Sequence, residues 1–395
     1  MSTDGAEAPA RPGLELVEDA LWRAAEATLP APARSGATLT QAVIERSRRY
    51  TSDRDLLDED LDGGAAAADL AARALFFAVA DAAKVAVPLA ELAGRGLLPA
   101  RDPLRVLDLG AGAGAMTLGA AAYLAASGRP ARLAVVAVDR DRPALALFER
   151  AARDLAGALD GRIDLELRGE LLRDAALERG GYDLVVVGSV LNELDERGRT
   201  GLVERALTAL ADGGALVVIE PALRETSRDL HRLRDHVLAH QLAHVFAPCI
   251  RAVAPCPALA RERDWCHEDR PLSLPPRANR IAQVTGLRDG GMKFAYLVLR
   301  AAADPLVEVA GRRAALRIVS DSKRLKGRRE CTGCGEDGWV RLRLLSRHRD
   351  DHNRAFERAR RGDVVVLDRT ASAGELRDLD ADEEVDRVVT TDPAG

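Results

Sequence analysis

The stretch Arg105-Val-Leu-Asp-Leu-Gly-Ala-Gly-Ala-Gly114 decides how the middle of this chain folds. Its first half is an apolar run broken by Asp108, and Gly110, Gly112 and Gly114 then alternate with alanines before a helical pattern begins. Glycine is favoured where a strand turns sharply into a helix and where backbone amides approach a ligand closely. The stretch therefore predicts a cofactor-binding loop at the end of a buried strand.

Apolar runs and helical patterns alternate downstream of this loop. Further strands are predicted at 133–139, 163–167, 182–188, 215–220 and 294–299, and a helix is predicted at 225–244. Strands separated by helices indicate a parallel sheet with helices on both faces. Asp139 ends the second strand, where an acidic side chain can accept hydrogen bonds from the ribose of a nucleoside-type cofactor.

The loop resembles motif one of the class I S-adenosylmethionine methyltransferases. A dinucleotide site would have a third glycine where this chain has Ala115. The resemblance implies a Rossmann-like class I methyltransferase sheet that binds S-adenosylmethionine, with Asp108 facing the cationic amino acid end of that cofactor. Asn192 and Glu220 are polar candidates at strand ends, and we expect Asn192 in the cofactor site. The sequence identifies no catalytic base or nucleophile.

The sequence character changes on both sides of this α/β region. Five segments are predicted: a disordered start (1–13), a helical N-terminal domain (14–98), the methyltransferase-like domain (99–303) with a cysteine-rich insertion (248–267), a basic β-rich RNA-binding domain (304–369) and an acidic disordered tail (370–395). In the helical domain, the stretches 14–28, 39–50 and 65–92 carry apolar residues at helical spacing.

The composition is that of a soluble globular protein, with 47% hydrophobic and 30% charged residues. The chain begins without a signal-peptide pattern, and no apolar run approaches the roughly 18 residues needed to span a bilayer. We therefore expect a cytoplasmic monomer that has no membrane partner. Cytoplasmic thiols stay reduced, so clustered cysteines are expected to be metal ligands or reactive groups rather than disulfides.

Five cysteines occur in two groups. Cys249, Cys256 and Cys266 lie within eighteen residues, and Cys331 and Cys334 follow later. The spacings in the first group are wide for a zinc hairpin and are compatible with an iron–sulfur cluster, whose ligands come from irregular loops. Spacing alone leaves three possibilities open: an iron–sulfur cluster, zinc, or unconnected buried cysteines.

Charge is distributed unevenly along the C-terminal part. Residues 312–361 contain 16 lysines and arginines and 7 aspartates and glutamates, a balance of +9, whereas residues 371–395 have a balance of −6. A basic segment in an acidic protein indicates a polyanionic partner or a solvated charged face. We expect Arg341, Arg343 and Arg347 to contact RNA phosphates.

Several motifs together resemble the methyltransferase-like small-ribosomal-subunit protein family of bacteria and mitochondria, which includes assembly factors. The motifs are the glycine loop, Gly188-Ser-Val-Leu-Asn-Glu-Leu194, Ile219-Glu-Pro221, Ala254-Pro-Cys-Pro257, Trp265-Cys-His267 and Cys334-Gly-Glu-Asp-Gly338. The resemblance covers roughly residues 40–368. It implies small-subunit rRNA binding and a role in assembly or maturation of that subunit.

The same resemblance implies a [4Fe–4S] cluster held by Cys249, Cys256, Cys266 and Cys334. Cys334 is preferred to Cys331 because Cys-x₃-Gly matches the family's segment, and His267 is an alternative zinc-type ligand. Two other functions remain open from sequence: an active methyltransferase acting on a small molecule or protein, and a zinc-stabilised RNA-binding module.

Overall fold

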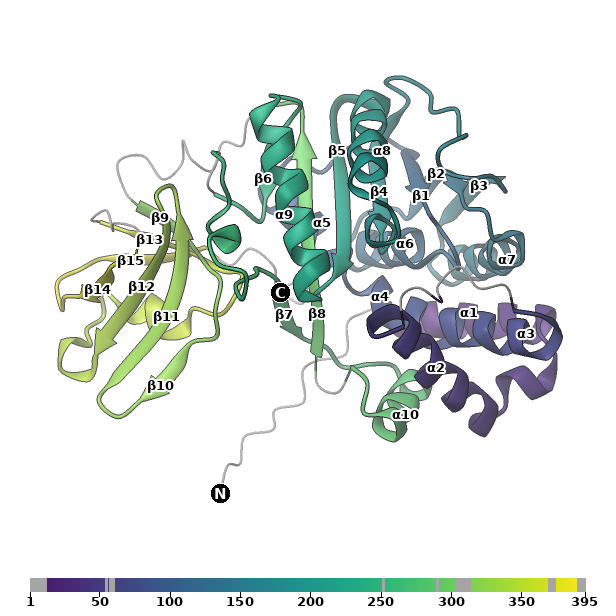
Figure 1. The fold of residues 1–395 in the computed structure, drawn as a ribbon, viewed down its shortest axis with the longest axis horizontal. Coiled ribbons are helices and arrows are strands. Elements are labelled where there is room, and N and C mark those ends of the chain that lie inside the picture. Colours follow the sequence, from purple (N-terminus) through teal and green to yellow (C-terminus); the bar gives the residue numbers. More distant parts are fainter. Residues whose placement is uncertain are drawn as a thin grey trace.

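The structure is a computed structural model that describes residues 13–53, 56, 61–250, 253–288, 291–302, 314–368 and 374–388. It has three parts: a group of N-terminal helices, a central sheet with helices on both faces, and a small β domain beside the sheet (Figure 1). Within those ranges, no helix is both long and apolar enough to cross a bilayer. The expectation of a disordered start concerns residues 1–13, of which all but Gly13 lie outside the described ranges.

The N-terminal part is helical, as predicted. Its helices are α1 (Leu14–Thr28), α2 (Gly36–Thr51), α3 (Gly63–Ala72), a π-helical turn (Arg73–Ala78), α4 (Val79–Ala82) and α5 (Ala86–Gly94). In α1, Leu14, Val17 and Leu21 recur at helical spacing and are buried, because this apolar stripe packs against the central domain. The predicted helical stretch 65–92 is divided by the π-helical turn and by a second break after α4.

The central sheet runs in the order β3-β2-β1-β4-β5-β8-β6, and β7 also pairs with β8. Its strands are β1 (Leu104–Leu109), β2 (Arg132–Val138), β3 (Arg162–Arg168), β4 (Tyr182–Gly188), β5 (Leu210–Pro221), β6 (His244–Ala247), β7 (Glu268–Pro271) and β8 (Gly291–Arg300). Strands β1 to β5 are parallel to one another. The chain leaves β1 toward β2 on one side and returns to β4 on the other, so the strand order reverses between β1 and β4. A ligand crevice is expected at the carboxyl ends of these two strands.

The far side of the sheet departs from the sequence prediction in two places. Strand β8, predicted as a further strand of a parallel sheet, lies between β5 and β6 and is antiparallel to both. The helix predicted for 225–244 ends at Ala239, and His244–Ala247 forms β6 instead. Periodicity along the chain does not reveal which neighbour a strand will pair with, so neither feature was visible in the sequence.

Different helices cover the two faces of the sheet. The covering helices are α6 (Ala115–Ala126), α7 (Arg142–Ala158), α8 (Glu196–Ala209) and α9 (Arg224–Ala239), whereas α10 (Pro276–Thr285) packs against the N-terminal helices. In β1, Val106 joins the apolar core formed with α6, α7 and the N-terminal helices, whereas Leu107 joins the core formed with α8 and α9. Both side chains are fully buried, because neighbouring residues of a strand point to opposite faces.

The small β domain has its own sheet and core. Its elements are β9 (Ala314–Ile318), β10 (Lys323–Leu325), β11 (Arg328–Gly335), β12 (Gly338–Leu345), α12 (Arg354–Arg358), β13 (Val364–Leu367), β14 (Leu376–Leu379) and β15 (Val385–Val388). The strand order is β14-β12-β11-β9-β13-β15, with β10 paired to β11. Short 3₁₀ turns elsewhere are Ala31–Arg34, Leu191–Glu193, Pro257–Leu259 and Ser346–His348.

The prediction that 370–395 is a disordered tail was wrong for residues 374–388, where β14 pairs with β12 and β15 pairs with β13. Leu379 and Val385 are buried in the core of the small domain. Arginines neutralise the acidic side chains of this segment: Arg343 pairs with Asp378, and Arg377 pairs with the buried Glu383. The high net charge of this segment indicated disorder. Composition does not show that partners for these charges exist elsewhere in the fold.

Candidate functional site

The glycine loop follows β1 at the point where the strand order reverses. Gly110, Gly112 and Gly114 have φ angles of 76°, 51° and 85°, which glycine adopts without strain. A Cβ atom on Gly110 would lie 2.2 Å from Val190, and one on Gly114 would lie 2.1 Å from the ring of Phe148. A Cβ atom on Gly112 would instead have a single near neighbour among the described atoms, an Asp139 oxygen 3.9 Å away. The loop is therefore packed tightly at both ends and open in the middle.

Asp108 lies beneath the loop and is 1% exposed. Its Oδ2 accepts a hydrogen bond of 2.7 Å from the hydroxyl of Thr117. Its Oδ1 is buried and has no hydrogen-bond partner among the described residues. Burial raises the pKa of Asp108 to about 7, against the opposing effect of the Thr117 hydrogen bond. A ligand amine would satisfy this oxygen and favour the ionised carboxylate.

Asp139 follows β2 and is tied to the same loop. Its Oδ2 accepts the backbone N–H of Gly112 at 2.8 Å, and its Oδ1 accepts the N–H of Asp141 at 2.8 Å. Each carboxylate oxygen has two lone pairs, so both oxygens can still accept a hydrogen bond from a hydroxyl group of a ligand. The two acidic residues selected from sequence, Asp108 and Asp139, thus flank the loop from neighbouring strands.

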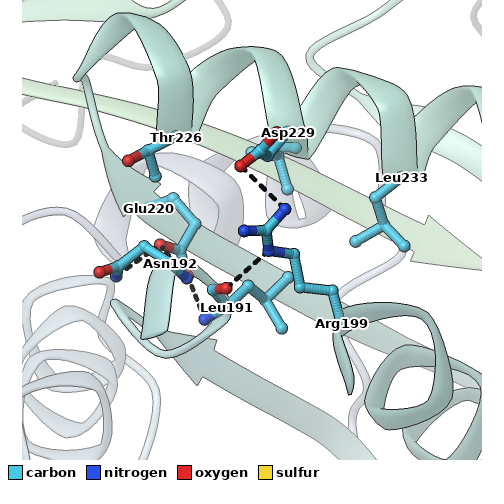
Figure 2. A pocket seen from close by; sticks show the side chains of 8 residues that line it. Leu191, Asn192, Arg199, Glu220, Thr226, Asp229 and Leu233 are labelled. Carbon is cyan, nitrogen blue, oxygen red and sulfur yellow. Dashed lines mark hydrogen bonds and ion pairs between the residues drawn. The ribbon is translucent and has the colours of Figure 1, made fainter. Parts of the chain in front are cut away.

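Asn192 and Glu220 contact each other after β4 and β5 (Figure 2). The buried Glu220 carboxylate accepts the backbone N–H groups of Val190, Leu191 and Asn192 at 3.0, 2.8 and 3.3 Å and the Asn192 side-chain amide at 2.8 Å. Burial raises the pKa of Glu220 to about 7 despite these hydrogen bonds. Glu220 therefore holds the turn after β4 in shape, and one N–H of the Asn192 amide is directed to Glu220.

A small pocket lies beside this turn, against α9. Figure 2 shows Arg199 reaching across it, where its guanidinium donates to the Leu191 carbonyl at 2.9 Å and pairs with Asp229 at 2.8 Å. The Arg199–Asp229 ion pair lines this pocket. It fixes α8 and α9 to the turn after β4.

Arg73, in the π-helical turn, connects the N-terminal helices to the turn after β2, beside the glycine loop. Its guanidinium pairs with Asp141 at 2.6 Å and with Asp69 at 3.0 Å. Asp141 also caps α7 by accepting the N–H of Ala144 at 2.9 Å. A buried pair between Asp69 and Arg46 continues this network into α2. Sequence reasoning missed Arg73, since an arginine in an apolar helical stretch reveals no partner 68 residues away.

The cysteine loop between β6 and β7 brings three thiols together and adds a fourth from the small domain. Burial raises the pKa of the Cys266 thiol well above its usual value, and the nearby thiols of Cys249, Cys256 and Cys334 raise it further. Burial and Cys249 likewise raise the pKa of Cys256 to about 12. The thiols of Cys249, Cys256 and Cys334 are thus near enough to Cys266 to affect its ionisation, and these are the four cysteines that the family resemblance implied.

Cys331 is separate from this group. Cys331 and Cys334 are three positions apart on β11, so their side chains point to opposite faces of the strand. Cys331 is 6% exposed and belongs to the apolar core of the small domain, where burial alone raises its thiol pKa to about 12 against the effect of Arg329. Cys334 faces the other way, toward Cys266.

Polar side chains of α9 hold the cysteine loop. Arg228 donates to the carbonyls of Ala258, Arg261 and Asp264 at 3.0, 2.7 and 2.7 Å. One turn further, His231 contacts the Cys266 carbonyl at 3.0 Å, and next to it Asp235 accepts the N–H of Cys256 at 2.8 Å. The loop-binding residues are Arg228, His231, Arg234 and Asp235, and the Arg234 charge interacts with Cys249 and Cys256.

Sequence reasoning missed these residues of α9, although their spacing of three to four is a recognisable signal of a polar helix face that meets protein rather than solvent.

Burial and Arg361 lower the pKa of His267, the alternative zinc-type ligand, to about 4. Its ring stacks on Trp265 with centroids 5.8 Å apart. Across the described part of the chain, no group of three or more His, Cys, Asp or Glu side chains is arranged to hold a single metal ion.

Two buried charges join the small β domain to the central domain. Arg317 of β9 is 3% exposed and pairs with the buried Glu91 of α5 through contacts of 2.6 and 3.1 Å. Arg317 also donates to the carbonyls of Pro248 and Gly362 at 2.9 and 2.6 Å. Glu91 in turn accepts the Tyr296 hydroxyl at 3.0 Å. The carbonyl of Pro248 precedes Cys249, so this junction lies beside the thiols.

The three arginines expected to contact RNA lie on or just after β12, and they differ in their surroundings. Arg341 is exposed, and Arg347 is exposed and donates to His348 at 3.3 Å. Arg343 is already engaged, because both its Nε and its Nη2 donate to Asp378 of β14, at 2.5 and 2.7 Å. RNA binding by these arginines stays a prediction, and it is weakest for Arg343.

A protein family and several solved structures resemble this chain. Residues 68–365 match the protein family described as "Mitochondrial small ribosomal subunit Rsm22". Magnesium protoporphyrin IX methyltransferase from Synechocystis PCC 6803, solved with bound SAM, is 15% identical and has a TM-score of 0.34, and the match covers 66% of this chain and 96% of that one. A SAM-dependent methyltransferase from Leishmania major is 14% identical, with a TM-score of 0.35 and coverage of 71% and 90%. No curated protein matches the sequence.

The predicted Rossmann-like class I methyltransferase sheet is confirmed by the strand order, with its antiparallel strand next to β5. The family match extends over this sheet, the cysteine loop and most of the small β domain. The chain therefore belongs to the mitochondrial small ribosomal subunit Rsm22 family.

Proposed function

We propose that the protein binds the rRNA of the small ribosomal subunit and acts in the assembly or maturation of that subunit, as a cytoplasmic monomer. The family match carries this proposal, because residues 68–365 include both the methyltransferase sheet and the basic strands. The balance of +9 over residues 312–361 supports it further. Such a charge suits a polyanion and has no use in an enzyme whose substrate is a small neutral molecule.

Co-sedimentation tests this function. The purified protein is expected to sediment with isolated small subunits or their precursors at low salt, and to leave them steeply as salt rises, because each neutralised phosphate releases counterions. Large subunits serve as the control. Equal binding to both subunits, or binding to neither, would contradict the proposal.

The loop Gly110–Gly114 is proposed to bind S-adenosylmethionine. Three features fit that cofactor: the open middle of the loop, the unpaired oxygen of Asp108, and Asp139 beside Gly112. In this arrangement Asp108 would face the amino group of the methionine part, and Asp139 would accept the ribose hydroxyls.

Calorimetry with S-adenosylmethionine tests the cofactor site. Gly112→Val would fill the open middle of the loop, and Asp139→Ala would remove the ribose contacts. The loss of a charge-assisted pair costs ~1.5–3 kcal/mol, so Asp139→Ala is expected to weaken binding roughly ten- to hundredfold. Absence of binding by the unchanged protein would remove the cofactor from the proposal and leave the fold untouched.

Cys249, Cys256, Cys266 and Cys334 are proposed to hold a [4Fe–4S] cluster. The donor set fits, because it consists of four thiols, and sulfur is the ligand that iron–sulfur clusters and zinc both prefer. A cluster with these ligands would link the central domain to the small β domain covalently, and its loss is expected to loosen the small domain first.

Metal and sulfide analysis of anaerobically purified protein, with its absorption spectrum, distinguishes the two metals. Stoichiometric iron and sulfide with broad visible absorption is the expected result. One zinc ion per chain without iron or sulfide would replace the iron–sulfur cluster by zinc and favour the zinc-stabilised RNA-binding module.

Methyl transfer is a second candidate function, and the intact cofactor loop is the observation that favours it. Incubation with radioactive S-adenosylmethionine and small-subunit precursors tests this activity directly. Label in rRNA or protein that disappears in Gly112→Val would establish an active methyltransferase. Unlabelled products despite measurable cofactor binding would show that the fold serves only for binding.

A further inference from the structure

The hairpin 323–329, formed by β10 and the start of β11, concentrates positive charge at one tip of the small β domain. Its sequence Lys-Arg-Leu-Lys-Gly-Arg-Arg has five cations and no acidic residue. Lys326 and Gly327 form the two-residue turn, and Gly327 has a φ angle of 75°. Sequence reasoning did not predict these strands, because basic residues interrupt their apolar pattern. In Figure 1, the hairpin projects from the lower left of the small domain, away from the central sheet.

Carboxylates neutralise many cations of the basic segment, including Arg328 of the hairpin. The pairs are Arg317–Glu91, Arg328–Glu330, Arg343–Asp378, Arg349–Glu357, Arg354–Asp351 and Arg361–Asp321. By contrast, Lys323, Arg324 and Lys326 are exposed, and none forms an ion pair with a carboxylate of the described residues. Three unneutralised cations of the segment thus lie next to one another at the hairpin tip, whereas the others among the described residues, such as Arg341 and Arg347, lie elsewhere in the domain.

The arrangement within the hairpin is unfavourable for an isolated protein. Arg324 lies directly opposite Arg329 across the two strands, and like charges in such pairs destabilise a sheet. Leu325, between two cations, is 42% exposed. A polyanion bound at the tip would relieve the repulsion, and an exposed apolar side chain can contact sugars or unstacked bases.

One face of the sheet connects the hairpin to the exposed Arg341. Lys323 lies opposite Glu330, and Glu330 lies opposite Arg343, so these three side chains share a face. Arg341, two positions before Arg343 on β12, points to that face as well. The same face of β11 continues to Cys334, so an RNA strand along it would run from the hairpin toward the thiols.

We propose that the hairpin 323–329 is the main contact of this protein with the phosphate backbone of small-subunit rRNA, and that Arg341 extends this contact along β12. The inference rests on the proposed rRNA binding and assigns it to a particular part of the chain. Contacts of this kind hold the RNA backbone without reading its sequence.

Filter binding of the full-length protein to small-subunit rRNA, measured over a series of salt concentrations, tests the hairpin. The variant Lys323→Glu/Arg324→Glu/Lys326→Glu is expected to bind at least about tenfold more weakly at low salt. The slope of log affinity against log salt should fall by about 2–3, as expected for three lost phosphate contacts.

The matched control is Arg150→Glu/Arg179→Glu/Arg197→Glu, which makes the same change in net charge on exposed residues of the central domain. It is expected to bind within about twofold of the unchanged protein. Circular dichroism melting of both variants checks that they fold. Ultraviolet cross-linking of the unchanged protein to rRNA should in addition label the peptide that contains Leu325.

Three results would overturn the inference, and they differ in what else they affect. If the unchanged protein binds rRNA and the hairpin variant binds equally well, the hairpin is not the contact but the proposed function stands. If the unchanged protein does not bind rRNA, both proposals fail. If the hairpin variant loses only binding to vesicles of phosphatidylserine and phosphatidylcholine, the hairpin recognises a membrane surface instead.

Discussion

The carboxylate of Asp108 is placed where its charge matters to folding and, under the proposed function, to cofactor binding. Its pKa of about 7 lies above the value of 3.8 that an exposed aspartate has, because the side chain is buried. The folded protein therefore holds a proton between about pH 4 and pH 7 that the unfolded chain has released. It follows that stability falls as the pH rises through this window and stays low above it.

Asp108→Asn removes this dependence, since an amide does not ionise. At pH 8 the variant is expected to be more stable to urea than the unchanged protein, by an amount on the order of 1–4 kcal/mol. The difference should shrink toward zero near pH 4. Urea melts at pH 4.5, 6 and 8 would measure it, and calorimetry should show weaker binding of S-adenosylmethionine. A constant difference at all three pH values would mean that Asp108 does not titrate in this range.

Cys331 and Cys334 form a matched pair of residues for testing the thiol cluster. Cys334→Ser is expected to abolish bound iron and sulfide, because Cys334 is the thiol that faces Cys266. Cys331→Ser is expected to keep both and to lower stability by ~1 kcal/mol or more, because it puts a hydroxyl into an apolar core. Metal analysis and melting of the two variants give the readouts. Loss of iron in Cys331→Ser at an unchanged melting temperature would show that Cys331, rather than Cys334, is the fourth ligand.

At the scale of single elements, α9 supports the cysteine loop as a scaffold. One face of the helix packs on the sheet through Leu230, Leu233 and Val237, and another carries the side chains that bind the loop. The 3₁₀ turn Pro257–Leu259 and the following bend lie in this loop, and Arg228 binds their carbonyls. The loop therefore depends on a helix that precedes it in sequence.

Arg228→Ala is expected to loosen residues 254–266 because three carbonyls lose their donor. Stability should fall by about 1–3 kcal/mol, and amide hydrogen exchange within the loop should speed up. Arg232→Ala is the control on the same helix, since Arg232 is half exposed and pairs only with Asp229 among the described residues. Equal exchange rates in the two variants would show that the conformation of the loop does not depend on Arg228.

On the scale of the whole molecule, the Arg317–Glu91 pair determines how the small domain is attached. Both charges are buried, and both are satisfied by further hydrogen bonds from Tyr296 and to backbone carbonyls. A buried pair of this kind contributes little net stability compared with apolar groups, but the loss of one partner is costly because the other charge remains buried.

Arg317→Met is expected to destabilise the protein by about 3–5 kcal/mol. Hydrogen exchange should increase in β9 and β13 more than in β1 and β4. The double variant Glu91→Leu/Arg317→Met should recover part of the loss, because it also removes the buried carboxylate, which in Arg317→Met keeps Arg95 as its remaining ion-pair partner. Urea melts and hydrogen exchange measure both effects. If the double variant is less stable than Arg317→Met, the buried carboxylate is not the cause of the loss.

The sequence by itself determined the features that depend on neighbours along the chain. Three alternating glycines after an apolar run predicted the loop between β1 and α6, and alternating strands and helices predicted a parallel sheet with helices on both faces, because both backbone conformation and apolar periodicity are local properties. It also singled out Asp108 and Asp139, since an acid at a strand end is recognisable without knowing what lies beside it.

Only the tertiary structure decided which distant segments meet. It put β8 between β5 and β6, gave β12 the strand β14 of the acidic segment as its neighbour, and buried Cys331 in the core of the small domain while Cys334 lies near Cys266. The partners of Arg73, Arg317 and Arg343 lie between 35 and 226 residues away in sequence. Ion pairs and strand pairing depend on distances through space, which composition and periodicity do not contain. The charge of the C-terminal segment therefore predicted a disordered tail, although the fold supplies partners for its strands and charged side chains.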